Sequence, residues 1–171
     1  DHEQIILLPN NSNIILAAQQ ARELSSKQII VVPSKTIPQG IAALLAFNYQ
    51  ASLQTNAELM QEACKQVQTA EVTRAVRSVQ VNGLSIAEGQ VIGLLNDDLT
   101  TAGEDITTVV FDLLKRVYSE GHEIITIYYG ENISNDEATV LADQIREAYP
   151  DLEVEVHDGG QAHYYYIISI E

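Results

Sequence analysis

The fold is decided by two apolar runs near the start of the chain, Ile5-Ile6-Leu7-Leu8-Pro9 and Ile29-Ile30-Val31-Val32-Pro33, which stand 24 residues apart. Neither run alternates apolar with polar residues, a pattern typical of strands buried on both faces in a parallel sheet that helices cover. Neither proline can donate to a strand ladder, so each marks the end of its strand. We therefore expect the two following loops at the carboxyl edge of one sheet, where α/β folds usually hold their sites.

A polar loop and a helix follow each run. Asn11 or Ser12 should cap a helix that ends near Leu24, and Pro38 should begin a second helix with Thr36 or Ile37 at its cap. Helix N-termini and polar side chains of this kind can donate hydrogen bonds to an anion. The candidate donors are Asn10, Asn11, Asn13, Lys35, Thr36 and Gln39. Ordinary capping, which needs no ligand, explains the same residues, and both interpretations stay open.

Apolar residues at helical spacing predict which helix faces are buried. The first helix should turn Ile14, Ala17, Ala18 and Ala21 inward. A third helix, with Asn56 as its cap, should turn inward Leu59, Met60, Ala63, Cys64 and Val67. Cys64 is thus expected to be a small core residue and not a nucleophile. As the single cysteine it excludes an internal disulfide and fits a reducing cytoplasm.

Residues 69–101 change character and predict a small antiparallel meander. Val72, Arg74 and Val76 stand at period two, and Asn82-Gly83 is a strong hairpin signal. Asn96-Asp97-Asp98 turns the chain again before the last third. Its adjacent acids are expected to be turn residues, since no third ligand follows at calcium-loop spacing.

The last third returns to alternating helices and strands. We expect a helix over 104–120, a strand over 123–129, a helix with a Ser134 and Glu137 capping box, and strands over 152–156 and 164–170. The predicted fold class is α/β, with a mixed sheet whose parallel core strands, Ile5–Leu8, Ile29–Val32 and Ile124–Tyr128, are covered by helices. We expect three segments, 1–68, 69–101 and 102–171, in one compact C-terminal domain of a longer protein.

Charge is distributed unevenly along the chain. Residues 1–95 hold six Lys/Arg against seven Asp/Glu, whereas residues 96–171 hold three against seventeen, a net charge of −14. Such an excess of acid argues against binding to nucleic acid or to an anionic membrane surface. It permits a basic protein partner, and it is equally consistent with a surface that only keeps the domain in solution.

Motifs for common catalytic chemistry are absent from the sequence. Lys35-Thr36 lacks the glycines of a phosphate loop, no Gly-x-Ser-x-Gly elbow exists, and the four histidines have no zinc-ligand spacing. No apolar stretch is long enough to span a membrane. From the residues alone we expect an α/β domain with no catalytic residue, no metal site and no cofactor of its own.

Several motifs resemble the bacterial fatty acid kinase A subunit family, the dihydroxyacetone-kinase-like proteins. The motifs that carry the resemblance are Ile6 to Ile14 with the sequence Ile-Leu-Leu-Pro-Asn-Asn-x-Asn-Ile, Val32 to Ala43, Glu71 to Arg77, Tyr129-Gly130-Glu131, and Gly159-Gly160-Gln161 with Tyr164. They cover nearly the whole chain in order, and they resemble the C-terminal region of that family.

The resemblance implies a function for the parent protein. An N-terminal kinase domain, outside these residues, would use ATP and magnesium to phosphorylate a fatty acid carried by a separate DegV-like binding protein. The acyl phosphate would feed membrane phospholipid synthesis. This chain would be a non-catalytic, cytoplasmic docking domain that contacts the DegV-like protein and its own kinase domain. The further binding candidates are Arg74, Arg77, Gly130, Glu131, Asp158, Gly159, Gly160, Gln161 and Tyr164. A phosphate or carboxylate site at the carboxyl edge, with Asn10, Asn13, Lys35 and Thr36 as donors, remains the alternative.

Overall fold

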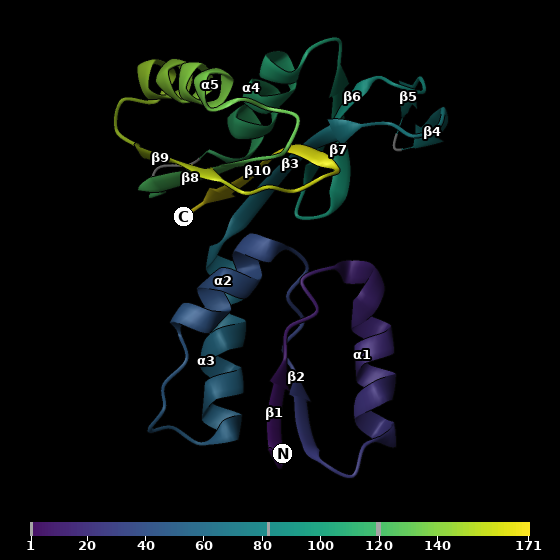
Figure 1. Ribbon diagram of the computed structural model, residues 1–171, viewed down its shortest axis with the longest axis vertical. Coiled ribbons are helices and arrows are strands. Elements are labelled where there is room, and N and C mark those ends of the chain that lie inside the picture. The colour runs from purple at the N-terminus through teal and green to yellow at the C-terminus, as the bar shows by residue number, and fades with distance from the viewer. Residues whose placement is uncertain (1, 82, 119–120) are drawn as a thin grey trace. The chain divides into compact units, whose positions relative to one another are not determined.

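The computed structural model describes residues 2–81, 83–118 and 121–171, and the chain divides into two units, Asp1–Val67 and Gln68–Glu171. Both units combine helices with strands, which confirms the predicted α/β class (Figure 1). None of the helices in the described ranges is long and apolar enough to cross a membrane.

The first unit has a two-stranded parallel sheet between helices. Its elements are β1 (Gln4–Leu7), α1 (Ser12–Leu24), β2 (Gln28–Val31), α2 (Ile37–Leu45) and α3 (Leu53–Gln66). The register sets Ile5 beside Ile29 and Leu7 beside Val31, so the repeat at 24 residues becomes two adjacent strands. Figure 1 shows α1 on one face of this sheet and α2 with α3 on the other.

The core of the first unit is small. It is formed by Val32, Ala43, Ala57, Met60 and Cys64. On α1 only Ala18 is buried, so the inward positions predicted for Ile14, Ala17 and Ala21 are wrong, and Leu59 on α3 is likewise exposed. A sheet of two strands gives a helix little apolar surface to cover, which the helical spacing alone could not reveal.

The third helix begins earlier than predicted. Ser52 is its cap and accepts a hydrogen bond from the Thr55 N–H, whereas Asn56 lies inside the helix and is buried. The Asn56 amide accepts from the Asn48 N–H at 2.7 Å and donates to the Asn48 carbonyl at 2.9 Å. Asn56 therefore holds the connection between α2 and α3 instead of capping a helix.

The second unit is organised around a six-stranded mixed sheet in the order β7-β6-β3-β10-β8-β9. Its elements are β3 (Gln68–Arg74), β4 (Val79–Val81), β5 (Leu84–Ile86), β6 (Val91–Leu95), β7 (Asp98–Gly103), α4 (Ile106–Val117), β8 (Ile124–Tyr129), α5 (Asn135–Ala148), β9 (Glu153–Asp158) and β10 (Tyr164–Ile170). Only β8 and β9 pair in parallel within this sheet.

Strand pairing differs from the prediction in one respect. β8 lies in a different sheet from β1 and β2, so the expected parallel core of three strands is wrong. The antiparallel strands predicted within 69–101 are present, but β3, β6 and β7 join the six-stranded sheet, because β3 pairs with the distant β10. Only β4 and β5 form a separate pair. The predicted hairpin turn includes Asn82, which lies outside the described residues.

The helices α4 and α5 cover one face of the six-stranded sheet (Figure 1). The predicted apolar stripe of α4 is confirmed, with Val109, Val110, Leu113 and Leu114 buried. The capping box of Ser134 and Glu137 at the start of α5 is also confirmed. Gly93 on β6 lets α4 approach closely, since a Cβ there would lie 2.8 Å from side-chain carbons of Val109 and Leu113.

Candidate functional site

The two proline loops of the first unit lie against each other, as the repeat predicted. The Asn10 N–H donates to Ser34 Oγ at 3.1 Å, and the Ser34 hydroxyl donates to Asn10 Oδ1 at 2.7 Å. Ser34 is fully buried, and Asn10 adopts a left-handed backbone with φ of 54°. Gly40 at the start of α2 makes room for the Asn10 amide, because a Cβ there would lie 2.6 Å from Asn10 Cγ. The loops therefore interlock.

The other polar groups of these loops serve the helix ends. Asn11 caps α1 by accepting from the Asn13 N–H at 2.9 Å, and Thr36 caps α2 by accepting from the Gln39 N–H at 3.4 Å. The Gln39 side chain in turn accepts from the Lys35 N–H at 2.9 Å. Capping thus accounts for most of the polar side chains considered as anion donors, whereas the side chains of Asn13 and Lys35 point to no shared cavity and are exposed.

Cys64 is a core residue. Its thiol donates to the Gln39 carbonyl at 3.3 Å, and burial raises the pKa of the thiol above its ordinary value. A raised pKa keeps the sulfur protonated, which is the opposite of what a nucleophilic cysteine needs.

In the second unit, the structure brings the loop after β8 against the loop between β9 and β10. The Gly130 N–H donates to the Tyr165 carbonyl at 2.9 Å, and the Glu131 N–H donates to the Gln161 carbonyl at 3.1 Å. A Cβ on Gly130 would lie 2.6 Å from the Gln161 carbonyl oxygen and closer still to that of Tyr164. Gly130 is therefore required for close approach of the two backbones.

The Gly159-Gly160-Gln161 segment is held by its own side chains. Gln161 Nε2 donates to the Tyr128 carbonyl at 2.8 Å, and its amide oxygen packs where a Cβ on Gly159 would stand. Asp158 accepts from the Gly160 N–H at 3.1 Å, and Gly160 has a φ of 61°. These residues build a rigid turn, which gives the family-like motif a structural explanation.

Exposed charge surrounds these joined loops. Glu131 and Asp158 are exposed, and they follow β8 and end β9, whose paired residues Tyr129 and Asp158 lie side by side. Next to them the ring of Tyr128 stacks on His157 with 5.8 Å between centroids. We define the loop surface as Glu131, Asp158 and the backbone of Gly159–Gln161.

The tyrosines of this unit are less exposed than a presented aromatic anchor would be. Tyr166 is buried, while Tyr129, Tyr149 and Tyr165 pack against the main core. Arg74 Nε donates to the hydroxyl of Tyr165, and the guanidinium lies 5.6 Å from the centre of that ring. Arg74 thus joins the neighbourhood of the loop surface through β10, whereas Arg77 is exposed beyond the end of β3.

A cluster that the sequence analysis missed surrounds Glu71 on β3. Glu71 is only 7% exposed, and burial together with the charge of Asp97 raises the pKa of its carboxyl to about 7. Burial, Glu71 and Asp97 likewise raise the pKa of Tyr164. The signal available in the sequence was period two, because Thr69, Glu71 and Thr73 alternate with apolar residues. Within the described ranges, no three His, Cys, Asp or Glu side chains are arranged to hold a metal ion.

Comparison with protein families gives one match that spans the chain. Residues 1–171 match the FakA-like C-terminal family, which represents the C-terminal region of fatty acid kinase A-like proteins. Protein YloV of Bacillus subtilis is 41% identical over 169 residues, which are 99% of this chain and 31% of that protein. An uncharacterized protein of Staphylococcus aureus (strain USA300) is 36% identical over the same length and share. The chain thus spans about a third of these curated relatives.

Solved structures share the fold at low sequence identity. The fatty acid kinase B3 protein of Streptococcus pneumoniae, loaded with linoleic acid, has a TM-score of 0.64 at 13% identity, over 99% of this chain and 72% of that one. A DegV family protein of Corynebacterium glutamicum has a TM-score of 0.65 at 15% identity, over 98% and 74%. The dihydroxyacetone kinase of C. freundii has a TM-score of 0.59 at 14% identity, over 96% and 38%.

Proposed function

The chain belongs to the FakA-like C-terminal family of fatty acid kinases, and from this premise we propose that it is the docking domain of a fatty acid kinase. In this proposal it binds a DegV-like protein that carries a fatty acid. A kinase domain elsewhere in the same polypeptide then transfers phosphate from ATP, with magnesium, to the fatty acid carboxylate.

The observation that carries the docking proposal is the loop surface of the second unit. Two loops that are far apart in sequence are locked together by backbone hydrogen bonds, so a partner would meet a rigid surface. Rigid surfaces lose little conformational entropy on binding. Glu131 and Asp158 project from this surface, where exposed charge can steer a partner of opposite charge.

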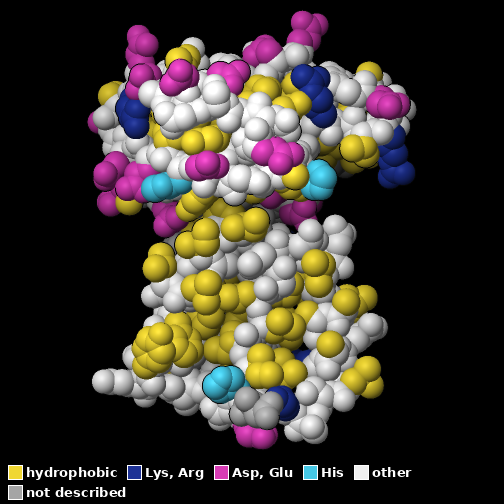
Figure 2. Space-filling view, in the orientation of Figure 1, with side chains coloured by type: hydrophobic (Ala, Val, Ile, Leu, Met, Phe, Trp, Pro, Cys, Tyr) yellow, Lys and Arg dark blue, Asp and Glu magenta, His cyan; other side chains and the backbone are white. Residues whose placement is uncertain are grey.

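The charge of the two units supports the same location. The first unit has four Lys/Arg against five Asp/Glu, and the second has five against nineteen. On the face that Figure 2 shows, acidic side chains gather over the second unit, while the first unit shows mainly hydrophobic and uncharged groups. A basic patch on the DegV-like partner is therefore the complement that we expect.

The alternative, a phosphate or carboxylate site at the proline loops, has weaker support. Asn10 is bonded to Ser34, while Thr36 and Gln39 satisfy backbone groups at the start of α2. Docking at the loop surface is the function that the geometry favours.

Titration of the chain with an acyl-loaded DegV-like protein tests the proposal. Calorimetry should detect binding that weakens as salt rises, since exposed charges are screened. Reversing Glu131 and Asp158 to lysine should weaken binding further, whereas the same reversal at Glu123 and Asp151 should matter less. The control pair is exposed, and it lies at the opposite ends of β8 and β9.

A further inference from the structure

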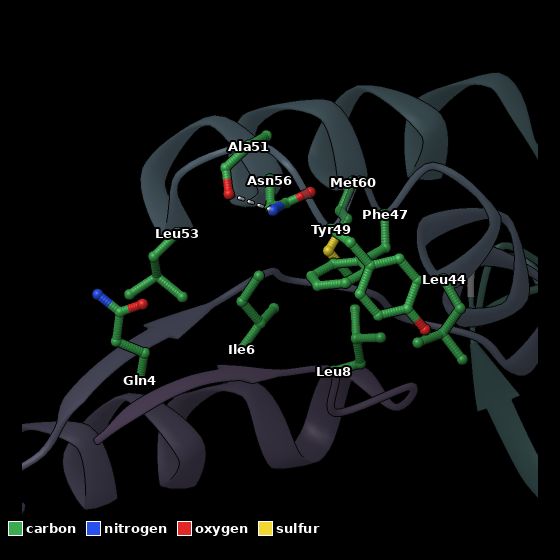
Figure 3. A pocket seen from close by; sticks show the side chains of 10 residues that line it. All are labelled: Gln4, Ile6, Leu8, Leu44, Phe47, Tyr49, Ala51, Leu53, Asn56 and Met60. Atoms are coloured by element: carbon green, nitrogen blue, oxygen red, sulfur yellow. Dashed lines mark hydrogen bonds between the residues drawn. The ribbon is translucent and has the colours of Figure 1, made fainter. Parts of the chain in front are cut away.

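A second binding surface lies in the first unit, beside β1. A cavity of about 450 Å³ opens there between the strand and the connection from α2 to α3. Figure 3 shows Ile6 and Leu8 pointing from β1 toward Phe47 and Met60 across this space. A volume of this size is typical of pockets that take a ligand or several side chains.

The lining of the cavity defines the chemistry of its occupant. No side chain among its lining residues carries a charge, and its two amides come from Gln4 and Asn56. The Asn56 amide is already bonded to the backbone at Asn48 and Ala51. The cavity therefore offers no partner to a charged head group, and an uncharged apolar group fits it.

Backbone groups of β1 add a second requirement. The Gln28 N–H donates to the Glu3 carbonyl and the Val32 N–H donates to the Leu7 carbonyl, so odd-numbered residues of β1 face β2. In a parallel pair the alternate residues face away. The N–H and C=O groups of Gln4, Ile6 and Leu8 consequently face the other edge, where the described ranges provide no neighbouring strand. The same three residues line the cavity.

The open edge lacks the features that usually prevent pairing. The strand Gln4–Leu7 contains no charge, proline or bulge, any of which would discourage an added strand. Apolar groups at the mouth of the cavity are also exposed, with Tyr49 at 94% and Leu44 at 62%. An extended backbone satisfies the edge, and its alternate side chains reach the cavity.

We propose that the open edge of β1 and this cavity bind an extended, uncharged segment of a partner protein, which adds as a third strand and places an apolar side chain beside Ile6 and Phe47. Such a segment uses the edge for affinity and the cavity for selection. A second copy of this chain is the weaker candidate, because a net charge of −15 on each copy opposes self-association. The inference does not depend on the docking proposal for the loop surface.

A synthetic peptide of about seven residues, blocked at both ends and alternating threonine with leucine, is a suitable probe for the intact chain. Adding it should slow hydrogen exchange at the Ile6 and Leu8 amides by about tenfold or more, and leave Ile5 and Leu7, already bonded to β2, nearly unchanged. The same peptide with N-methyl groups at alternate amides keeps its side chains but loses its donors, and should not bind.

A pair of variants separates the cavity from a general effect. Ala51 lines the cavity, so Ala51→Phe should fill it and weaken the peptide about tenfold, without a large change in melting temperature. Ala21→Phe makes the same substitution at an exposed position of α1 and should leave affinity unchanged.

Three results would overturn the proposal. They are absence of peptide binding, equal binding by the N-methylated peptide, and equal loss in the Ala51→Phe and Ala21→Phe variants. A dimer in sedimentation, with the Ile6 and Leu8 amides already protected in the free chain, would assign the edge to a second copy and also overturn it.

Discussion

Asn10 and Ser34 bind each other through two hydrogen bonds, of 3.1 Å from the Asn10 N–H and 2.7 Å from the Ser34 hydroxyl, and so join two loops that the repeat places 24 residues apart. The pair lies where the carboxyl ends of β1 and β2 meet, a common location for ligands in α/β folds. In this chain the same polar groups hold the loops together.

Removing the Ser34 hydroxyl should therefore destabilise the protein. Ser34→Ala leaves the Asn10 N–H and amide oxygen without their partner, at a cost of about 1–3 kcal/mol in the free energy of unfolding. Urea unfolding measures the effect. Ser26→Ala is the control, since Ser26 is exposed, and it should change stability by less than about 0.5 kcal/mol. Equal stability of the two variants would show that the Asn10 and Ser34 bonds contribute little.

A methyl group at Gly130 should disturb the loop surface. Its Cβ would stand 2.6 Å from the Gln161 carbonyl oxygen, so the backbone must shift. We expect Gly130→Ala to lose about 1–3 kcal/mol or more of stability, as overpacked sites do. Ala162→Ser, in the same loop but exposed, is the comparison. Thermal melting that failed to distinguish the two would mean that the close approach has been misjudged.

Much of the local structure could be predicted from the sequence. Asn11, Thr36 and the Ser134 with Glu137 box cap their helices as expected, because caps depend on residues within one turn. Pairing between distant strands could not be predicted. Thr73 lies beside Tyr164, a contact between residues too far apart for any local pattern to specify. The same long-range pairing draws β3, β6 and β7 into the six-stranded sheet.

The candidate site divides along the same line. Gly130, Glu131 and Gln161 were found through the family-like motifs, and the structure joins them. Glu71 was missed because a single acid in a strand is usually exposed, and only the fold shows that it is buried. The cavity beside β1 combines residues from three elements and has no signature in the sequence.

Stability should depend on the ionisation of Glu71. Its pKa rises from 4.5 to about 7 on folding, so its contribution to stability is present below pH 4.5 and is lost as pH rises through 7. Relative to Glu71→Gln, the normal protein should lose up to about 3 kcal/mol across that range. Unfolding free energies of both proteins at several pH values measure this difference. A difference that did not vary with pH would place the Glu71 carboxyl in water.

Catalysis should require more than this chain. We expect the purified chain to neither hydrolyse ATP nor phosphorylate a fatty acid, since the proposal assigns the nucleotide to another domain of the kinase. A phosphate-release assay with magnesium and ATP tests this, with the complete kinase and its acyl-loaded partner as the positive control. Turnover by the chain alone would contradict its assignment as a docking domain.

The measurement that tests docking most directly is calorimetric titration of the charge-reversed chain with an acyl-loaded DegV-like protein. Glu131→Lys with Asp158→Lys should weaken binding clearly more than Glu123→Lys with Asp151→Lys, because the first pair lies on the loop surface. Melting temperatures serve as the folding control, and exposed substitutions should change stability by no more than about 0.5 kcal/mol. Unchanged affinity in the folded Glu131 and Asp158 variant, or no binding by the unaltered chain, would contradict the account.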